Sequence, residues 1–569
     1  MKNIYILFST LFSMLMYSQT SYNREWGTMI EPVNFGSNHI ASVNPINGNL
    51  YYVSEYYEII EYNINNYQSK SIFKFNPTSF GTIIQNIVVD NEGNLIVSGR
   101  GAGAPPATTG TYNIGGHFIV KISSTGNVLL SLRVGILSLN KTQLAVDKFN
   151  NIYFVSKFDK NTILTNSPFH ATADTSSIIN SQDAITKLSS TGQHVWSSFY
   201  TKDQSLIKSI VAGDDGIYVY GDHMACTSTS NYFGTTGSYQ EYATGAYTGA
   251  GGNENNVFLT KFNLNGTRAW STYFAVDRSF IPHSETLNYY GGLTVINNEP
   301  YILTKHEILP IMTKNPTTKG AYLTKQVSMS QYDITATKFS STGVRLWTTF
   351  LYYGEAISKS YDSDDLFISG TAIENNQYLT SMVSNNAYQN NFGGNRTDNY
   401  IFSLSIDGSK MNYGTFYGGT GNDLGVTFAT KNGFYTLGYS SLNNSSTSMF
   451  STNPLLNQFT YDNNGKEYYG TYISYFKRKS LGLKDSSSKP VVFNIYPNPA
   501  TNVLNIQCKD ILPENTLFTV FNIAGKKVLI EKGQSTEVNQ INISNLSAGV
   551  YVLKIDSNGT NQVVKFIKK

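Results

Sequence analysis

The side chains best suited to chemistry in this sequence are carboxylates, and the closest group of them is Asp362, Asp364 and Asp365. A hard cation such as calcium binds several carboxylate oxygens at once, so this group suggests a metal site. Aspartate is also ordinary in tight turns, and this stretch reads as a turn between two strands. We therefore predict no metal site and keep calcium at these three residues as the alternative.

Further carboxylates in the connections between predicted strands could supply an acid and a base for cleaving glycosidic bonds. Such chemistry needs two carboxyl groups about 5–10 Å apart, a separation that sequence spacing does not reveal. They are Asp174, Asp183, Glu241, Glu254, Glu307, Asp333, Glu374 and Asp398. The sequence contains no Gly-x-Ser-x-Gly, His-Glu-x-x-His or Walker motif. We predict no catalytic residue and no cofactor; the alternative is an enzyme that degrades extracellular polysaccharide or peptide.

The connection at residues 222–256 is the strongest candidate for recognition, because it places aromatic side chains among small, flexible residues. Loops of this composition contact ligands in many binding proteins, and elsewhere such aromatics anchor the loop to the protein body. Both interpretations stay open. The candidate ligand residues are Tyr232, Phe233, Tyr239, Tyr242 and Tyr247.

These connections lie between copies of one repeat unit. Its clearest copy is TKLSSTGQHVWSSFY at residues 186–200, and close copies start at Thr260 and Thr337. The turn glycines of successive copies stand 65 to 77 residues apart, a period typical of blade or solenoid arrays. They are Gly126, Gly192, Gly266, Gly343 and Gly408.

Each unit contains four predicted strands, which we name a to d in chain order. In the fourth unit they cover residues 207–211, 217–220, 257–262 and 269–274, with Asp, Asn and Gly in the turns. Four antiparallel strands per repeat are typical of a propeller blade. Up-and-down strand order places the a–b and c–d turns at one end of each blade. The extra length falls between b and c, so we expect short turns on one face and long loops on the other.

Two residue types recur at matching positions in four of the units each. A tryptophan on strand d could form a sugar-stacking platform, but packing between blades is the favoured interpretation. A lysine on strand c could line a charged channel, but a solvated or snorkelling side chain is favoured. The residues are Trp26, Trp196, Trp270, Trp347, Lys121, Lys187, Lys261 and Lys338.

The two ends of the array are each incomplete. Residues 25–30 match the d strands, but no a, b or c strand precedes them. The seventh unit supplies a c strand at 468–476 and then no d strand. An N-terminal strand that completes the last blade would resolve both gaps and remove the unpaired edges of an open array. We therefore predict a closed ring.

The units resemble the seven-bladed β-propeller repeats found in many secreted bacterial proteins. The best local match is GTFYGGTGND at residues 414–423, and the resemblance covers most of residues 20–480. It implies an all-β fold in which residues 19–483 form a propeller of seven four-stranded blades.

A second strand-rich region follows a polar linker at residues 484–490, and residues 491–569 read as a small β-sandwich. Three motifs in it resemble the type A C-terminal sorting domain of the Bacteroidetes type IX secretion system. Their defining residues are Pro497, Asn498, Pro499, Gly525, Leu546, Gly549 and Tyr551. The resemblance implies contact with the type IX machinery, passage across the outer membrane, and then release or attachment to the cell surface.

The start of the chain agrees with export. A charged start and an apolar run at residues 4–17 predict a signal peptide, residues 1–18, that is too short to span a membrane; no other span is expected. The net charge of +3, with 14% charged residues and no basic tract, argues against a nucleic-acid partner. Cys226 and Cys508 fall in different predicted domains, so we expect no disulfide. We also expect a monomer.

The leading functional prediction is non-catalytic binding of a glycan or a protein partner through the long b–c loops. The alternatives are the degradative enzyme and a structural or adhesive surface component. Carboxylates that converge on the central pocket would favour the enzyme, and a pocket lined by Tyr and Asn would favour the binding protein.

Overall fold

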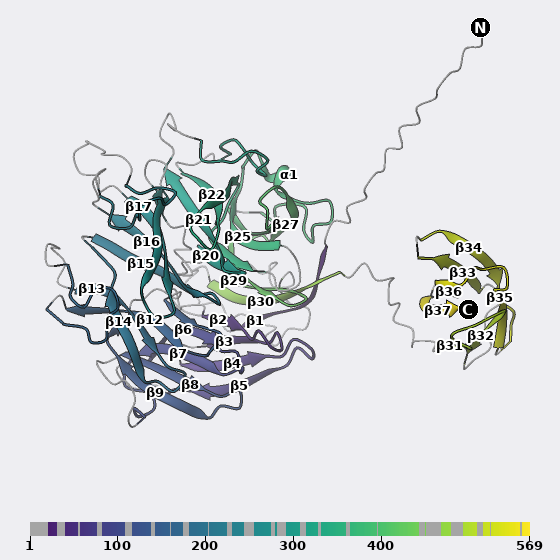
Figure 1. Ribbon diagram of the computed structural model, residues 1–569, viewed down its shortest axis with the longest axis horizontal. Helices are drawn as coiled ribbons and strands as arrows, with labels where there is room; N and C mark the ends of the chain where they lie inside the picture. Colours follow the sequence, from purple (N-terminus) through teal and green to yellow (C-terminus); the bar gives the residue numbers. More distant parts are fainter. Residues whose placement is uncertain are drawn as a thin grey trace, which may run out of the picture. The chain divides into compact units, whose positions relative to one another are not determined.

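Figure 1 shows the computed structural model of the protein, which describes residues 21–479 and 493–569 with internal gaps. The gaps are 31–39, 55–56, 77–81, 109–116, 138–142, 160, 175–180, 203, 225–229, 244–254, 275–278, 281–291, 308–314, 328–331, 360–364, 395, 443–449, 451–467, 509–515, 524, 537 and 558–559. The predicted signal peptide and linker lie outside the described residues. The chain divides into two compact units, Met1–Arg478 and Lys479–Lys569. The finer limits 1–18, 19–483, 484–490 and 491–569 remain predictions.

The described residues of the first unit form seven antiparallel sheets, one for each predicted blade, and the sheets follow one another around a centre (Figure 1). Blade 1 is β2 (Ala41–Val43), β3 (Leu50–Ser54), β4 (Glu58–Tyr62) and β5 (Ser69–Lys74). Blade 2 is β6 (Ile83–Val89), β7 (Leu95–Arg100), β8 (His117–Ile122) and β9 (Val128–Val134). Blade 3 has a split a strand, and it is β10 (Ile136–Leu137), β11 (Leu144–Val146), β12 (Ile152–Asp159), β13 (Ser181–Leu188) and β14 (His194–Phe199).

The remaining blades repeat this order. Blade 4 is β15 (Gln204–Ala212), β16 (Gly216–Met224), β17 (Asn255–Asn263) and β18 (Arg268–Phe274). Blade 5 is β19 (Ser279–Phe280), β20 (Leu293–Ile296), β21 (Glu299–Glu307), β22 (Tyr332–Phe339) and β23 (Arg345–Leu351). Blade 6 is β24 (Ala356–Lys359), β25 (Asp365–Ile373), β26 (Thr397–Ser405) and β27 (Met411–Tyr417), with a single turn of helix, α1 (Leu379–Met382), before β26.

The seventh blade is completed by the N-terminal strand, as predicted. It contains β28 (Asp423–Thr430), β29 (Gly433–Leu442) and β30 (Tyr468–Arg478), and β1 (Tyr22–Ile30) pairs antiparallel with β30. Trp26 lies opposite Tyr475 in this pairing. The ring therefore closes by backbone hydrogen bonds between the two ends of the first unit, and the all-β propeller is confirmed.

Neighbouring blades are joined by the repeat tryptophans, whose predicted packing is confirmed. The Trp270 indole of blade 4 is buried and donates to the Ser341 carbonyl in the c–d turn of blade 5 at 2.9 Å. Gly343 in that turn has φ +85, and a Cβ there would lie 2.7 Å from the Trp270 ring. The glycine is thus required twice, once by the left-handed backbone and once by the indole beneath it.

The b–c connections do not lie only on one face of the propeller, where long loops were expected. In blade 4 the described part of the connection runs along the outer strand β18, where Thr235 N–H donates to Ser271 O and Tyr273 N–H donates to Gln240 O. Equivalent bonds tie Thr318 to Thr348 in blade 5. An outermost strand exposes unpaired backbone groups, and these segments satisfy them. The described loop residues therefore cover blade edges as well as one face.

The second unit forms two sheets, with the orders β31-β32-β35 and β34-β33-β36-β37. Its strands are β31 (Phe493–Tyr496), β32 (Val503–Cys508), β33 (Leu517–Asn522), β34 (Lys527–Lys532), β35 (Val538–Asn542), β36 (Gly549–Ser557) and β37 (Thr560–Lys568). Leu504, Phe518 and Leu553 are among the side chains that form one buried core. The small β-structure predicted from this strand-rich sequence is therefore confirmed.

Candidate functional site

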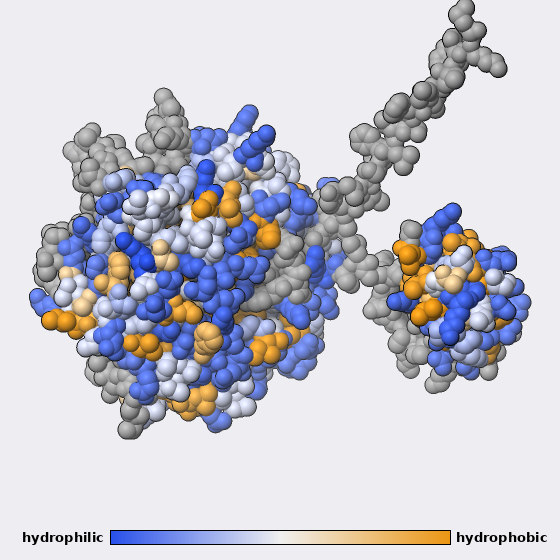
Figure 2. Space-filling model, viewed as in Figure 1, coloured by the Kyte–Doolittle hydropathy of each residue, from blue (hydrophilic) through white to orange (hydrophobic). Residues whose placement is uncertain are grey.

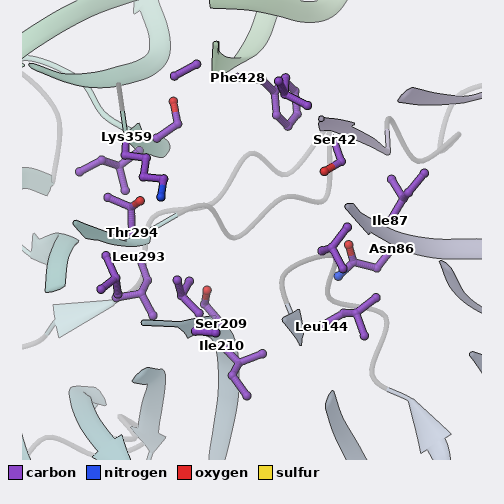
Figure 3. Close-up of a pocket in the computed structure, with 18 of the residues that line it drawn as sticks. Ser42, Asn86, Ile87, Leu144, Ser209, Ile210, Leu293, Thr294, Lys359 and Phe428 are labelled. Atoms are coloured by element: carbon purple, nitrogen blue, oxygen red, sulfur yellow. The ribbon is translucent and has the colours of Figure 1, made fainter. Parts of the chain in front are cut away.

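An axial cavity of about 330 Å³ lies where the innermost strands of all seven blades meet (Figure 3). Its lining comes from β2, β6, β11, β15, β20, β24 and β28. In β15, which ends at Ala212, the lining residues are Ser209 to Ala212, directly before the a–b turn. In β6 they are Asn86 to Val88, again beside the a–b turn. The cavity therefore lies in the half of the channel that is nearer the short turns, away from the long connections.

The chemistry of this cavity matches neither pattern considered from the sequence. Its lining is mainly aliphatic, with the hydroxyls of Ser42, Ser209 and Thr294, the Asn86 amide and the Lys359 amine. The described residues that line it include no carboxylate and no tyrosine. Among these described lining residues, the converging carboxylates that would favour an enzyme are thus not found.

The candidate ligand loop contains both buried and exposed aromatic residues. Phe233 is fully buried and stacks on Phe258 with ring centroids 3.8 Å apart, so its side chain is part of the core. Tyr232 is half-buried, and burial raises the pKa of its hydroxyl above the usual range. Both residues anchor the connection against the blade, which is the other role considered for these aromatics.

Tyr239 and Tyr242 remain accessible, with 41% and 49% of their surface exposed. The Arg345 guanidinium of the next blade lies 4.6 Å from the centre of the Tyr239 ring, which restricts the ring by a cation–π contact. Gln240, between them in sequence, donates its side-chain amide to the Tyr242 carbonyl at 2.8 Å. Tyr247 lies outside the described residues. Two of the five predicted residues, Tyr239 and Tyr242, are thus exposed in the same loop.

Asp183 and Glu241, two of the predicted acid/base carboxylates, already have hydrogen-bonding or ionic partners. Asp183 is buried, accepts the Ile207 N–H at 2.9 Å and forms an ion pair with Lys157 at 3.0 Å. Burial raises the pKa of Asp183, and the Lys157 charge offsets part of this rise. Glu241 accepts the Gly237 N–H at 2.6 Å.

The remaining carboxylates are distributed as follows. Asp174 is half-buried, Asp333 is buried and Glu374 is exposed; the Glu254 residue and the Glu307 side chain lie outside the description.

The fold brings Asp398 beside Asp423 from the next blade. Both are fully buried, and a Cβ at Gly418 would lie 2.5 Å from Asp398 Oδ1 and 2.8 Å from Asp423 Oδ2. Burial raises the pKa of Asp398 to about 8, and the negative charge of Asp423 contributes to this rise. Burial also raises the pKa of Asp423 to about 7. The Gly393 and Gly419 N–H groups each donate to one oxygen at 2.7 Å. The pair is shielded from solvent and so is not placed to act on a polymer.

The proposed calcium group can be placed only in part. Asp362 and Asp364 lie outside the described residues, and Asp365 is buried with its carboxylate accepting from Asn412. Within the described part of the chain, no cluster of three acidic, histidine or cysteine side chains is arranged to hold a metal ion.

Three of the four repeat lysines form ion pairs, so the favoured prediction of a solvated or snorkelling side chain is wrong for them. The Lys121 ammonium lies 2.8 Å from Asp90 and is buried, and the Lys338 ammonium lies 2.7 Å from Glu299. In each case the carboxylate is in the a–b turn of the same blade. The c strand lies inside the blade, between b and d, so its lysine reaches this turn instead of solvent.

The hydropathy of the face seen in Figure 2 marks no large apolar surface among the coloured residues. On the visible face of the first unit, apolar side chains form small, separated patches among hydrophilic ones (Figure 2). No helix in the described residues is long and apolar enough to cross a membrane.

The predicted motif residues of the second unit stabilise its turns and edges. Asn498 accepts the Ile567 N–H at 2.9 Å and so attaches the Pro-Asn-Pro segment to β37. Gly525 has φ +73 in the turn between β33 and β34. The Tyr551 hydroxyl donates to the Ser547 carbonyl at 2.9 Å. Pro497, Pro499, Leu546 and Gly549 belong to the same unit.

Comparisons with known proteins identify this unit. Residues 494–569 match the family described as "Secretion system C-terminal sorting domain". No curated protein matches the chain.

Solved structures show only distant similarity. They include a quinohemoprotein alcohol dehydrogenase from Comamonas testosteroni, with 7% identity, 83% of this chain and 79% of that chain covered, and a TM-score of 0.37. U3-55K has 6% identity, 79% and 98% coverage and a TM-score of 0.35. The RRP9 WD40 repeats have 7% identity, 80% and 99% coverage and a TM-score of 0.34. The strand pairing and the sorting-domain match together describe a secreted β-propeller with a type IX C-terminal sorting domain, which directs it to the cell surface or the extracellular space.

Proposed function

We propose that this secreted propeller is a non-catalytic binding protein that holds a glycan through the b–c connection of blade 4. The exposed pair Tyr239 and Tyr242 is the observation that carries the proposal. Exposed tyrosine rings bind with an apolar face and a polar hydroxyl at little entropic cost, a combination suited to the faces and hydroxyls of sugars.

The surroundings of this pair support a binding role. Arg345 holds the Tyr239 ring in place, and Phe233 anchors the same connection to the core. A ligand would thus meet a platform that is already ordered, which lowers the entropy lost on binding. Two polar groups belong to the same surroundings: the Arg345 guanidinium could donate to a sugar hydroxyl oxygen, and the Glu241 carboxylate could accept a hydroxyl proton.

The enzyme alternative has less support. Among the described carboxylates that could act as acid and base, Asp183 is paired, and Asp398 and Asp423 are buried without access. We keep release or surface attachment as two outcomes of the same secretion route.

The test is a glycan array probed with the full-length secreted protein and with a Tyr239→Ala, Tyr242→Ala double variant. We expect the double variant to lose at least about tenfold in affinity, a change of about 1.4 kcal/mol, with an unchanged melting temperature. A Tyr239→Phe, Tyr242→Phe variant should retain most binding because the rings remain. Phe149→Ala, which removes an aromatic that is 60% exposed in an a–b turn, is the matched control. Equal glycan binding by the double-alanine variant and the parent would refute the proposal.

A further inference from the structure

The axial cavity has the features of a second, chemically different site. Its walls are apolar side chains such as Ile87, Ile210 and Leu293, and the described lining contains one charged group, Lys359. Figure 3 shows the Lys359 amine directed into the cavity, with Ser42 and Asn86 pointing inward from the opposite side. A cavity of about 330 Å³ has room for a small organic molecule.

Lys359 is held in a position that favours an anionic ligand. Burial lowers the pKa of its amine, and the negative charge of Asp214, in the a–b turn of blade 4, offsets part of this effect. The amine has thus already lost much of its hydration in the folded protein. A carboxylate that binds beside it gains an opposite charge in a poorly solvated space, with little further desolvation of the lysine.

Polar side chains add hydrogen-bonding groups at the same place. The a strands stand at the inner end of each sheet and pair with a b strand on one side only, so they are the strands that line the cavity. The Ser42 hydroxyl and the Asn86 amide point inward from two of these strands.

We propose that the axial cavity binds a small organic monocarboxylate, with its carboxylate at Lys359 and its apolar body against Ile87, Ile210 and Leu293. A single lysine close to Asp214 suits one negative charge better than the two charges of a phosphate monoester, which proteins hold with several donors or cations. The aliphatic wall suits a hydrocarbon body better than a sugar. This site is separate from the tyrosine pair of blade 4 and does not depend on the glycan proposal.

The test is isothermal titration of the full-length protein with hexanoate and with its uncharged analogue hexanamide. We expect hexanoate to bind at least about tenfold more tightly, because only the carboxylate pairs with Lys359. In Lys359→Met this preference should vanish. Lys148→Met, which removes an exposed lysine from the a–b turn of blade 3, should keep it.

A second variant tests the position of the site without removing the charge. Ala212 lines the cavity from blade 4, so Ala212→Phe should fill part of the space and weaken hexanoate binding by a similar factor while Lys359 remains. The melting temperatures of all variants report whether the fold is intact. Equal binding of hexanoate and hexanamide by the parent, or an unchanged preference in Lys359→Met, would overturn the proposal.

Discussion

At the scale of single residues, Asp398 and Asp423 link the stability of the propeller to pH. Burial raises the pKa of Asp398 to about 8 and that of Asp423 to about 7, both above the ordinary value of 3.8. The folded protein therefore binds protons that the unfolded chain releases. The stability that the folded state gains from these bound protons is fully present below the pKa of aspartate in the unfolded chain. This stability is lost as the pH rises through about 7 to 8.

Replacing Asp398 by Asn should flatten this pH dependence. The amide keeps an oxygen for the Gly393 N–H but does not ionise beside Asp423. Between about pH 6 and about pH 9, we expect the parent to lose about 2 kcal/mol more stability than the variant, the size of a shift of one to two pKa units. Denaturant unfolding of both proteins at a series of pH values measures this difference in stability. Asp159→Asn, at an exposed position, is the control and should follow the parent; identical profiles for Asp398→Asn and the parent would show that the pair does not titrate as described.

Sequence reasoning found only one member of this pair. Asp398 was a candidate because it lies in a predicted b–c connection, whereas Asp423 appeared only as the last residue of the best family match. The two belong to different blades, so their proximity depends on how β26 and β28 pack. Phe233 and Tyr239 show the same limit, since composition marks both as loop aromatics and only the path of the loop along β18 separates a core residue from an exposed one.

At the scale of strands and turns, the packing of Trp270 against Gly343 is one example of a contact that recurs between successive blades. Trp347 in blade 5 similarly donates to Ile406 O at 2.9 Å, and Gly408 in blade 6 lies against its ring. The recurrence of tryptophan and turn glycine was visible in sequence because the chemistry is local and periodic. The sequence did not show that the tryptophan on strand d of one blade contacts the c–d turn of the next blade. A repeated motif does not indicate which of the two neighbouring blades it contacts.

Gly343→Ala should destabilise the propeller more than an alanine at an equally strained glycine. Gly320 has φ +84, nearly that of Gly343, but a Cβ there would meet nothing within 4 Å. Both substitutions carry a backbone penalty of about 1–2 kcal/mol. Gly343→Ala should add about 1–3 kcal/mol because its Cβ would overlap the Trp270 ring. Chemical denaturation of the two variants measures the difference, and equal losses would mean that the indole moves aside without cost.

At the scale of the whole molecule, the two compact units have different roles: the first forms the propeller, and the second matches a sorting domain. Residues 494–569 match a sorting domain, and the propeller ring closes within Met1–Arg478. The order of these regions was readable from sequence because each carries its own motifs. The position of the cavity near the short turns was not, because it depends on where seven separate strands end around one axis.

A chain that ends at Ser488 should fold but stay inside the cell envelope. The propeller keeps every strand of its ring, so its melting transition should match that of the full-length protein. Fractionation of cells that express each form, followed by immunoblotting, shows where the protein is. The full-length chain is the control, and normal arrival of the truncated chain outside the cell would exclude a sorting role for the second unit.

The pairing of β1 with β30 also sets an order in time. Tyr22–Ile30 is synthesised first, and its partner Tyr468–Arg478 is among the last parts of the propeller to be made. Joining such distant segments is slow, because a long loop must close before its contacts form. For most of its synthesis the nascent propeller is therefore an open arc with two unpaired strand edges, which neighbouring chains can capture before the ring is complete.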